Sequence, residues 1–271
     1  MSERIAFIGG GNMASAIIGG LISQGIAPGD IDVVEPFEEA RDKLKTLFGL
    51  APHAQADGFL TQARLVIWAV KPQTFKEAAL RVRFHTKAAL HLSVAAGIRS
   101  DSIAHWLGCE RVVRAMPNTP ALIGKGITAL FARPAVTTDD KERVERVISS
   151  TGDLLWLDAE EQLDAVTALS GSGPAYMFYF MEAMVSAGID MGLTRDQAHR
   201  LTVATFIGAG ELARASEDPP EILRQRVTSK GGTTHAALSS MENDNVKTQF
   251  VRALHAARRR ARELGDEFGG G

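Results

Sequence analysis

The chain is poor in cysteine and in aromatic side chains. Its 271 residues include one cysteine, Cys109, and only 6% are aromatic. A single cysteine excludes an intrachain disulfide and a metal site built from several thiolates. No spacing around Cys109 indicates a nucleophile, so we interpret this residue as structural and predict no metal centre.

The sequence also lacks an excess of charge of either sign. Lysine and arginine together number 30, aspartate and glutamate 32, and the formal net charge is -2. Binding to nucleic acid or to an anionic membrane therefore has no electrostatic basis in the composition. The one basic run, residues 258–262, is followed closely by Glu263 and Asp266, which is typical of a solvated helix face.

Long apolar runs are missing as well. No stretch reaches the roughly 18 residues that suggest a transmembrane helix, and the opening residues show no charged segment followed by an apolar one. We therefore expect a cytoplasmic protein without a secretory leader.

The first half of the chain alternates short apolar runs with helical spacing. Strands are expected at residues 5–8, 31–34, 65–70, 90–95, 112–115, 127–131 and 154–157. Helices are expected at residues 14–22 and 38–48, and Thr138 is expected to cap a further helix. Strands that alternate with helices predict an α/β domain, with a doubly wound, mostly parallel sheet covered by helices on both faces.

The strand pattern ends near residue 160, and the rest of the chain is expected to be helical. Helices are predicted at residues 175–187, 198–213, 220–227, 233–241 and 246–264. Pro174 opens the first of these, and Thr194 with Gln197 forms a capping-box pattern before the second. Several of these helices are apolar around much of their circumference, which favours burial against a partner subunit.

A glycine-rich turn follows the first predicted strand. The segment Ile8-Gly-Gly-Gly-Asn-Met-Ala14 fits the pattern G-x-G-x-x-A between a strand and a helix, which is typical of dinucleotide binding. Gly9 would allow the tight turn, Gly11 would let a pyrophosphate approach the backbone, and Ala14 would let helix and strand pack closely. The residues expected to contact the dinucleotide here are Ile8, Gly9, Gly11, Asn12 and Met13.

An acidic residue, Glu35, follows the second predicted strand. A carboxylate at this position binds the adenosine ribose hydroxyls, which favours NADH over NADPH. The alternative is an exposed loop acid before Pro36, with Arg41 close enough to reach a 2′-phosphate.

Other segments at predicted strand ends also belong to the expected cofactor site. Ligands of open parallel sheets bind beyond the carboxyl ends of the strands. Ala95, Ala96 and Gly97 are small enough to leave room for the nicotinamide ribose. Two prolines brace a loop that holds Asn118, whose amide can orient a carboxamide or line a pocket. The expected cofactor residues from these segments are Ala69, Val70, Lys71, Pro72, Ala95, Ala96, Gly97 and Asn118.

A second glycine turn, very different from the first, lies near the end of the chain. Gly231 and Gly232 are followed by Thr233, Thr234 and a helical run. Such a helix N-terminus offers bare backbone N–H groups and favours an anion. A chain with one turn for a dinucleotide and another for a small carboxylate is typical of a redox enzyme for a small acid.

Together these motifs resemble the pyrroline-5-carboxylate reductase family, in order and over nearly the whole chain. The segments that carry the resemblance are residues 7–13, 69–72, 95–97, 114–120, 170–175 and 220–242. The last segment is the most specific, because other dinucleotide enzymes share the first motif but not this one.

The resemblance implies an N-terminal Rossmann domain, residues 1–160, and an all-α domain for substrate binding and dimerisation, residues 161–271. It also implies an interlocked homodimer, which in this family often assembles into decamers. The implied reaction is the reduction of 1-pyrroline-5-carboxylate to L-proline with NADPH or NADH. Thr234 is implied as the catalytic residue near the ring nitrogen, and the implied substrate-binding residues are Glu217, Ser229, Gly231, Gly232, Thr233 and Thr234.

The chain departs from the family pattern at three positions. Lys230 stands where proline usually precedes the paired glycines, and Ala56 stands where an asparagine often contacts the adenosine ribose. Glu35 replaces the hydroxyl or basic residues that suit a 2′-phosphate. These departures leave the choice between NADPH and NADH open. Two other functions also remain as alternatives: a β-hydroxyacid dehydrogenase-like oxidoreductase and a non-catalytic NAD(P)-sensing protein.

Overall fold

The computed structural model describes residues 4–269. The predicted absence of a leader concerns the start of the chain, of which residues 1–3 lie outside the described residues. Contacts divide the chain into two compact units. Unit 1 comprises residues 1–172 and 257–271, and unit 2 comprises residues 173–256. This division rests on contacts, whereas the predicted boundary at residue 160 rests on where the strand pattern ends and on the family resemblance, so that boundary stays a prediction.

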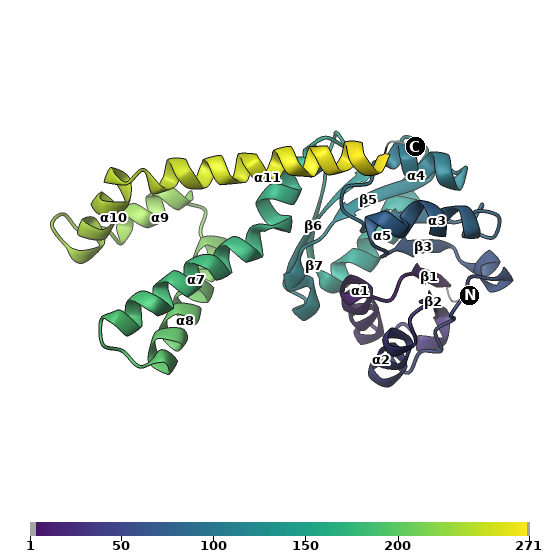
Figure 1. The fold of residues 1–271 in the computed structure, drawn as a ribbon, viewed down its shortest axis with the longest axis horizontal. Helices are drawn as coiled ribbons and strands as arrows, with labels where there is room; N and C mark the ends of the chain where they lie inside the picture. Colours follow the sequence, from purple (N-terminus) through teal and green to yellow (C-terminus); the bar gives the residue numbers. More distant parts are fainter. Residues whose placement is uncertain (1–3, 270–271) are drawn as a thin grey trace. The chain divides into compact units, whose positions relative to one another are not determined.

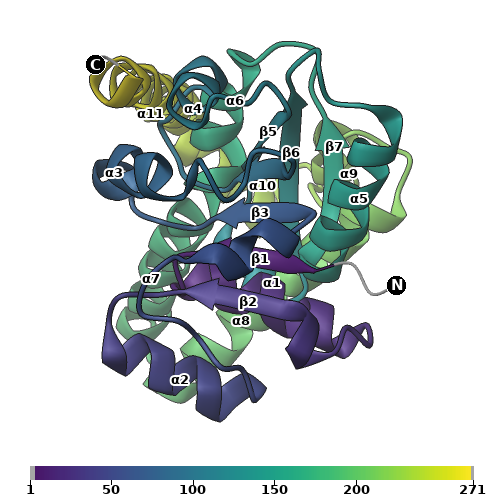
Figure 2. The same cartoon turned by 90° about the vertical axis from the view of Figure 1, so that its right-hand side faces the viewer.

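Unit 1 is built on one seven-stranded sheet with the order β2-β1-β3-β4-β5-β6-β7. The strands are β1 (Ile5–Ile8), β2 (Ile31–Val34), β3 (Leu65–Trp68), β4 (Leu90–Ser93), β5 (Val112–Met116), β6 (Gly126–Ala132) and β7 (Gly152–Trp156). Figure 2 shows β3, β1 and β2 in succession. The first five strands are parallel, β6 runs antiparallel to β5, and β7 is parallel to β6. The prediction of a mostly parallel sheet is confirmed.

Helices cover both faces of this sheet because successive strand residues point to opposite sides. The helices of unit 1 are α1 (Asn12–Ser23), α2 (Glu38–Phe48), α3 (Pro72–Val82), α4 (Ser100–Leu107), α5 (Thr138–Ile148), α6 (Gln162–Val166) and the C-terminal part of α11 (Val246–Gly269). Phe7 packs in a core with residues of α1 and α5. Its neighbour Ile8 packs in a second core with residues of α3 and α4.

The N-terminus of α5 corrects one detail of the prediction. Thr137, and not Thr138, caps this helix: its hydroxyl accepts from Asp140 N at 3.2 Å, and the Asp140 carboxylate accepts from Thr137 N at 3.2 Å. Thr138 is already the first helical residue. The predicted capping box at Thr194 and Gln197 before α8 (Arg195–Ala215) is confirmed.

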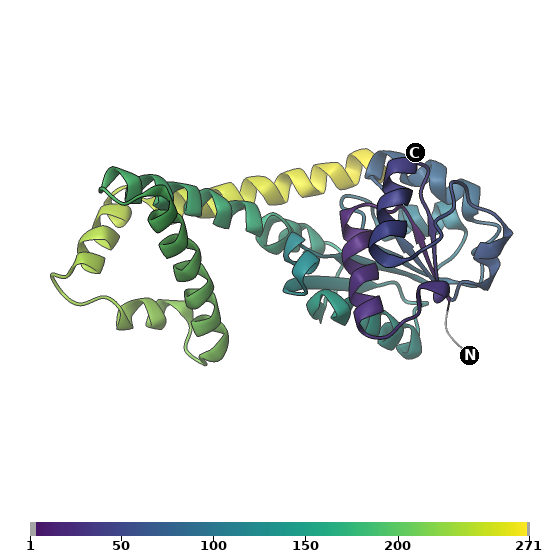
Figure 3. The same cartoon turned by 90° about the horizontal axis from the view of Figure 1, so that it is seen from below.

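Unit 2 is helical and leaves many large apolar side chains exposed. Besides α8 and the first half of α11 it contains α7 (Gly173–Asp190), α9 (Pro220–Arg226) and α10 (Thr233–Asn243). The helices α7 and α8 lie side by side (Figures 1 and 3). The exposed apolar residues include Phe178, Tyr179, Met184, Leu201, Ile207 and Leu212. Apolar surface of this kind marks an interaction site. Within residues 4–269 no helix is long and apolar enough to cross a membrane.

A buried histidine makes the stability of unit 1 dependent on pH. His91 on β4 accepts a hydrogen bond from Trp68 Nε1 at 3.1 Å and is 1% exposed. Burial lowers its pKa to about 4. Because an unfolded histidine titrates near 6.5, acid protonates the unfolded chain first, and stability is lost as the pH falls from about 6.5 toward 4.

We therefore expect His91 to lower the free energy of unfolding by about 2 kcal/mol between pH 7.5 and pH 5. The His91→Gln variant keeps an uncharged side chain that can accept from Trp68, and it should lack this part of the loss. Urea unfolding of both proteins at the two pH values and one protein concentration measures the difference. Equal losses in the two proteins would show that His91 does not contribute.

Candidate active site

The candidate cofactor site lies at the carboxyl edge of the parallel strands of unit 1. The glycine turn follows β1, Glu35 follows β2, and residues 69–72 follow β3. Residues 94–99 follow β4, and the loop that holds Asn118 follows β5. The parallel register of β1 with β2 and β3 brings the first three segments to the same edge. This is the edge at which open α/β sheets bind ligands.

The glycine turn has the geometry that its sequence predicts. Gly9 has φ +97°, and a Cβ there would lie 2.6 Å from the Ala69 carbonyl oxygen. Gly9 N donates to Val34 O at 2.9 Å, which fixes the turn to the end of β2. A Cβ on Gly11 would meet no atom within 4 Å. Gly11 is also the N-cap of α1, whose first turn has no side-chain cap and no acidic residue. The turn thus leaves open space and unpaired N–H groups where an anion can bind.

The carboxylate of Glu35 is held against the same turn. Its Oε2 accepts from Gly10 N at 2.8 Å and its Oε1 accepts from Phe37 N at 2.9 Å. Arg41 Nη1 donates to the carbonyl oxygens of Glu35 at 3.0 Å and Pro36 at 2.7 Å. The acidic group is 6% exposed and the guanidinium is tied to the backbone beside it. The alternative of an exposed loop acid is therefore wrong: the carboxylate of Glu35 is buried and held next to the turn by two backbone N–H groups.

The segment after β3 lies against the glycine turn, and the segment after β4 lies against α11. Val70 Cγ1 would be 3.0 Å from a Cβ on Gly9, so residues 69–70 border the glycine turn. Lys71 is the exposed N-cap of α3 and Pro72 is its first residue. Ala95 is buried, Ala96 is exposed, and Gly97 adopts φ +74°. A Cβ on Gly97 would lie 3.2 Å from Leu264 Cβ of α11, within unit 1.

Asn118 is engaged within the protein. Its Oδ1 accepts from Ile127 N at 3.0 Å, and its Nδ2 donates to Ser170 O at 3.2 Å. A Cβ on Gly171 would lie 2.5 Å from Met116 Cε. Asn118 thus bonds the loop after β5 to the π-helical turn Thr167–Gly171, and Met116 at the end of β5 packs closely against the same turn. Turns of this kind are frequent at functional sites.

The candidate substrate residues lie in unit 2, at the start of α10. Gly231 adopts φ +74°, and Gly232 is the N-cap with φ -80° and ψ 178°. Thr233 and Thr234 are the first helical residues, and the helix has no side-chain cap and no acidic residue in its first turn. Gly232 N donates to Ser229 O at 3.0 Å, which closes the preceding turn. This end of α10 offers N–H groups and two hydroxyls to an anion.

The two other predicted substrate residues, Ser229 and Glu217, precede this turn in the sequence. Ser229 is exposed, and Glu217 is exposed in the connection between α8 and α9. That connection is held by an ion pair between Arg226 Nη1 and Asp218 Oδ2 at 2.5 Å. A cavity of about 190 Å³ beside α10 is lined by His235 and Arg224, but not by Thr234. The predicted cofactor residues thus gather in unit 1 and the predicted substrate residues in unit 2.

Sequence reasoning assigned no role to Glu160 or to its partner Ser100. Their hydrogen bonds join positions 60 residues apart, so no local spacing signals them. Among residues 4–269 there is no group of three or more His, Cys, Asp or Glu side chains able to hold a metal ion.

The fold and the glycine turn define a dinucleotide-dependent oxidoreductase, and residues 4–97 match the family model described as "NADP oxidoreductase coenzyme F420-dependent". Residues 160–264 match the model "Pyrroline-5-carboxylate reductase dimerisation". The chain is 43% identical to a pyrroline-5-carboxylate reductase of Pseudomonas aeruginosa over 270 residues, 99% of each chain. The chain belongs to the pyrroline-5-carboxylate reductase family.

Solved structures with the same fold agree with this assignment. A pyrroline-5-carboxylate reductase from Coxiella burnetii superposes with a TM-score of 0.89 at 39% identity, covering 97% of this chain and 99% of that one. The pyrroline carboxylate reductase of Plasmodium falciparum, solved with NADP bound, has a TM-score of 0.86 at 26% identity and covers 97% and 98%. The predicted family, fold class and oxidoreductase class are confirmed.

Proposed function

We propose that this protein reduces 1-pyrroline-5-carboxylate to L-proline, the last step of proline synthesis, with NADPH or NADH as the reductant. The main support is the 43% identity to a curated reductase of that name over 99% of both chains. The second support is the pair of open helix N-termini, one after each glycine turn, that suit a dinucleotide and a carboxylate.

The residues of unit 1 fit a dinucleotide. The open space at Gly11 and the uncapped start of α1 accommodate the pyrophosphate, with Ile8, Gly9, Asn12 and Met13 forming the rest of the turn. Glu35 lies where the adenosine ribose binds. Ala69, Val70, Lys71, Pro72, Ala95, Ala96, Gly97 and Asn118 complete the proposed cofactor site. When bound, the dinucleotide supplies a hydride from C4 of its nicotinamide ring.

At the start of α10, the backbone N–H group of Thr233 holds the substrate carboxylate, and Gly232 borders it as the N-cap, because the N–H of Gly232 already donates to Ser229 O at 3.0 Å. The Thr234 hydroxyl accepts a hydrogen bond from the protonated ring nitrogen and orients it. Gly231 allows the turn, and Ser229 and Glu217 border the substrate. The C=N carbon receives the hydride, and the nitrogen carries the proton.

Little further acid–base machinery is needed for this reaction. A protonated iminium is already a good electrophile, so positioning the two reactants supplies most of the rate enhancement. This accounts for the lack of a histidine–aspartate or lysine-centred catalytic set among the proposed site residues.

The large apolar side chains that are exposed on the helices of unit 2 support self-association. The match to a family model for dimerisation supports it as well. We propose that the chain forms an interlocked homodimer, with a decamer as its larger assembly, and that it acts in the cytoplasm.

We also propose a functional boundary at residues 160/161, with a cofactor-binding domain before it and a substrate-binding and dimerisation domain after it.

Oxidation of NADPH and NADH, followed at the nicotinamide absorbance band, tests the proposed function. Addition of 1-pyrroline-5-carboxylate to the protein and reduced cofactor should cause a rapid loss of this absorbance. Addition of a β-hydroxyacid to the protein and oxidised cofactor should cause no increase in it. Turnover of the hydroxyacid alone would identify a dehydrogenase. Tight cofactor binding without any turnover would identify a sensor.

The choice of cofactor is expected to depend on Glu35. Replacing Glu35 with serine removes a fixed negative charge beside the proposed ribose site, so the preference should shift toward NADPH by about 1–2 kcal/mol, roughly 5- to 30-fold. The measurement is the ratio of kcat/KM for NADPH to that for NADH, which a general loss of stability does not change. The Glu38→Ser variant, which removes an exposed acid on α2, is the control. An unchanged ratio in Glu35→Ser would remove Glu35 from cofactor selection.

A further inference from the structure

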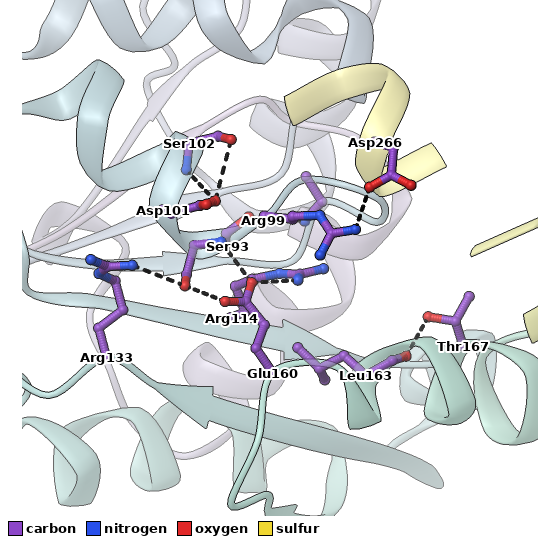
Figure 4. A network of polar contacts seen from close by, with 12 residues as sticks. Ser93, Arg99, Asp101, Ser102, Arg114, Arg133, Glu160, Leu163, Thr167 and Asp266 are labelled. Atoms are coloured by element: carbon purple, nitrogen blue, oxygen red, sulfur yellow. Dashed lines mark hydrogen bonds and ion pairs between the residues drawn. The ribbon is translucent and has the colours of Figure 1, made fainter. Parts of the chain in front are cut away.

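One carboxylate in unit 1, that of Glu160, joins two elements that are distant in the sequence. Glu160 lies between β7 and α6. Its Oε1 accepts from Ser100 N at 2.6 Å, and its Oε2 accepts from Ser100 Oγ at 2.5 Å. Its Oε1 also accepts from Arg114 Nη1 at 2.6 Å. Figure 4 shows Glu160 between Arg114 and the start of α4.

The helix α4 has no capping side chain at its N-cap position, but Asp101 in its first turn accepts from Ser102 N at 2.7 Å. Its N-cap residue is Arg99, whose side chain makes no capping hydrogen bond. A helix start has unpaired N–H groups and a positive dipole end, which a carboxylate satisfies well. Glu160 supplies a second carboxylate from 60 residues away, at Ser100 N, and so helps to fix the position at which α4 begins.

The loop between β4 and α4, residues 94–99, is fixed at both ends and also along its length, where Ile98 is buried in the core. At the first end, Ala95 N donates to Ser93 Oγ at 3.3 Å. At the second end, Ser100 is held by Glu160. Between them, Gly97 packs against Leu264, and Arg99 Nη2 pairs with Asp266 Oδ1 at 2.6 Å. Loss of the Glu160 contacts would release Ser100, the residue at which the loop passes into α4.

The same carboxylate also holds the strand that leads into the second loop. Arg114 is on β5, directly before the segment that contains Asn118. The side chains of Arg114 and Glu160 are 11% and 20% exposed, so their ion pair is largely shielded from solvent. A shielded, charge-assisted hydrogen bond is stronger than a surface one. Arg133 is paired with Glu110 and donates to Ser100 Oγ at 3.4 Å, and Arg99 is paired with Asp266. Arg114 is therefore the counter-ion of Glu160.

We propose that Glu160 is a positioning residue for the nicotinamide end of the cofactor site, because it sets the geometry of residues 94–99 and of the loop after β5. Glu160 acts through Ser100 and Arg114 and does not touch the reacting atoms. This inference rests on the proposed function in one respect: it takes these two loops as cofactor-binding loops.

The test compares Glu160→Gln with Glu161→Gln in the full-length protein. Glutamine keeps the shape of residue 160 but removes its charge and places an NH₂ group among donors. Glu161 is the adjacent acid and serves as the matched control. Hydrogen exchange of the cofactor-free protein is measured first. In Glu160→Gln the amides of residues 94–102 should exchange about tenfold faster, while Glu161→Gln should match the wild type.

Cofactor binding and kinetics are then measured on the same proteins. Calorimetry should show the Kd for NADPH and NADH raised about 5- to 20-fold in Glu160→Gln only. The KM for 1-pyrroline-5-carboxylate at saturating cofactor should change less than about twofold, because a positioning residue on the cofactor side leaves the other site intact. A milder variant, Ser100→Ala, removes only the hydroxyl hydrogen bond and should change the exchange rate and Kd in the same direction by a smaller factor.

Two results would overturn the proposal. One is unchanged exchange in residues 94–102 together with an unchanged cofactor Kd in both Glu160→Gln and Ser100→Ala. The other is a higher KM for the imine with the cofactor Kd unaffected. Failure of the proposed function itself would look different, because the wild type and Glu161→Gln would then also fail to oxidise cofactor with 1-pyrroline-5-carboxylate.

Discussion

Replacing Gly9 with alanine is expected to lower the affinity for both NADPH and NADH by about 30- to 100-fold and to cost about 2 kcal/mol of stability. The methyl group would lie 2.6 Å from the Ala69 carbonyl oxygen and 2.8 Å from the Ala69 carbonyl carbon. These are backbone atoms of the neighbouring strand end, so they cannot rotate away. Gly9 also has φ +97°, which L side chains rarely adopt. Fluorescence titration of cofactor and thermal unfolding measure the two effects.

Two other glycines provide controls for this experiment. A methyl group on Gly29 would meet no atom within 4 Å, and Gly29 has no positive φ, so Gly29→Ala should bind cofactor and unfold like the wild type. Gly11→Ala should unfold like the wild type but bind cofactor more weakly, because its Cβ points into the open space proposed for the pyrophosphate. Normal cofactor affinity in Gly9→Ala would mean that the turn does not bind the dinucleotide.

Replacing Thr234 with alanine is expected to lower kcat by about 10- to 100-fold while the cofactor Kd stays unchanged. The loss follows from removing the hydroxyl proposed to accept from the protonated ring nitrogen and to orient it. The helix should still form, since the side chain of Thr234 does not cap α10. Steady-state kinetics with 1-pyrroline-5-carboxylate and calorimetry with NADPH measure the two quantities.

The Thr234→Ser variant separates chemistry from packing. Serine keeps the hydroxyl and loses one methyl group, so its kcat should lie within about threefold of the wild type. Equal kcat values for the alanine variant and the wild type would remove the catalytic role of Thr234. A loss in the serine variant as large as that in the alanine variant would point to the methyl group instead.

The sequence predicted most of the elements, because their periodicity is strong and local. The strand at residues 31–34 and the helix at residues 38–48 lie where the pattern placed them. The strand predicted at residues 65–70 ends at Trp68, because its last two residues turn to meet the glycine turn. The cap of α5 was misplaced by one residue, since two adjacent threonines offer the same hydroxyl and only the backbone selects Thr137.

Candidate site residues were predicted where the chemistry sits in contiguous residues. The turns at Gly9 and at Gly231 each need backbone conformations that glycine permits, and both have positive φ. By contrast, the engagement of Asn118 with Ser170 joins residues 52 apart. The clamp at Glu160 likewise depends on which strand ends lie next to each other.

By itself, the amino-acid order determined the alternating sheet-and-helix plan, the two glycine turns and the family to which the chain belongs, because each is encoded by residues near one another in the chain. Tertiary structure alone decided which hydrogen bonds the carboxylates of Glu35 and Glu160 accept and which atoms crowd Gly9. These are short-range contacts, most of them between distant segments, so their distances are set only when the sheet has brought the segments together.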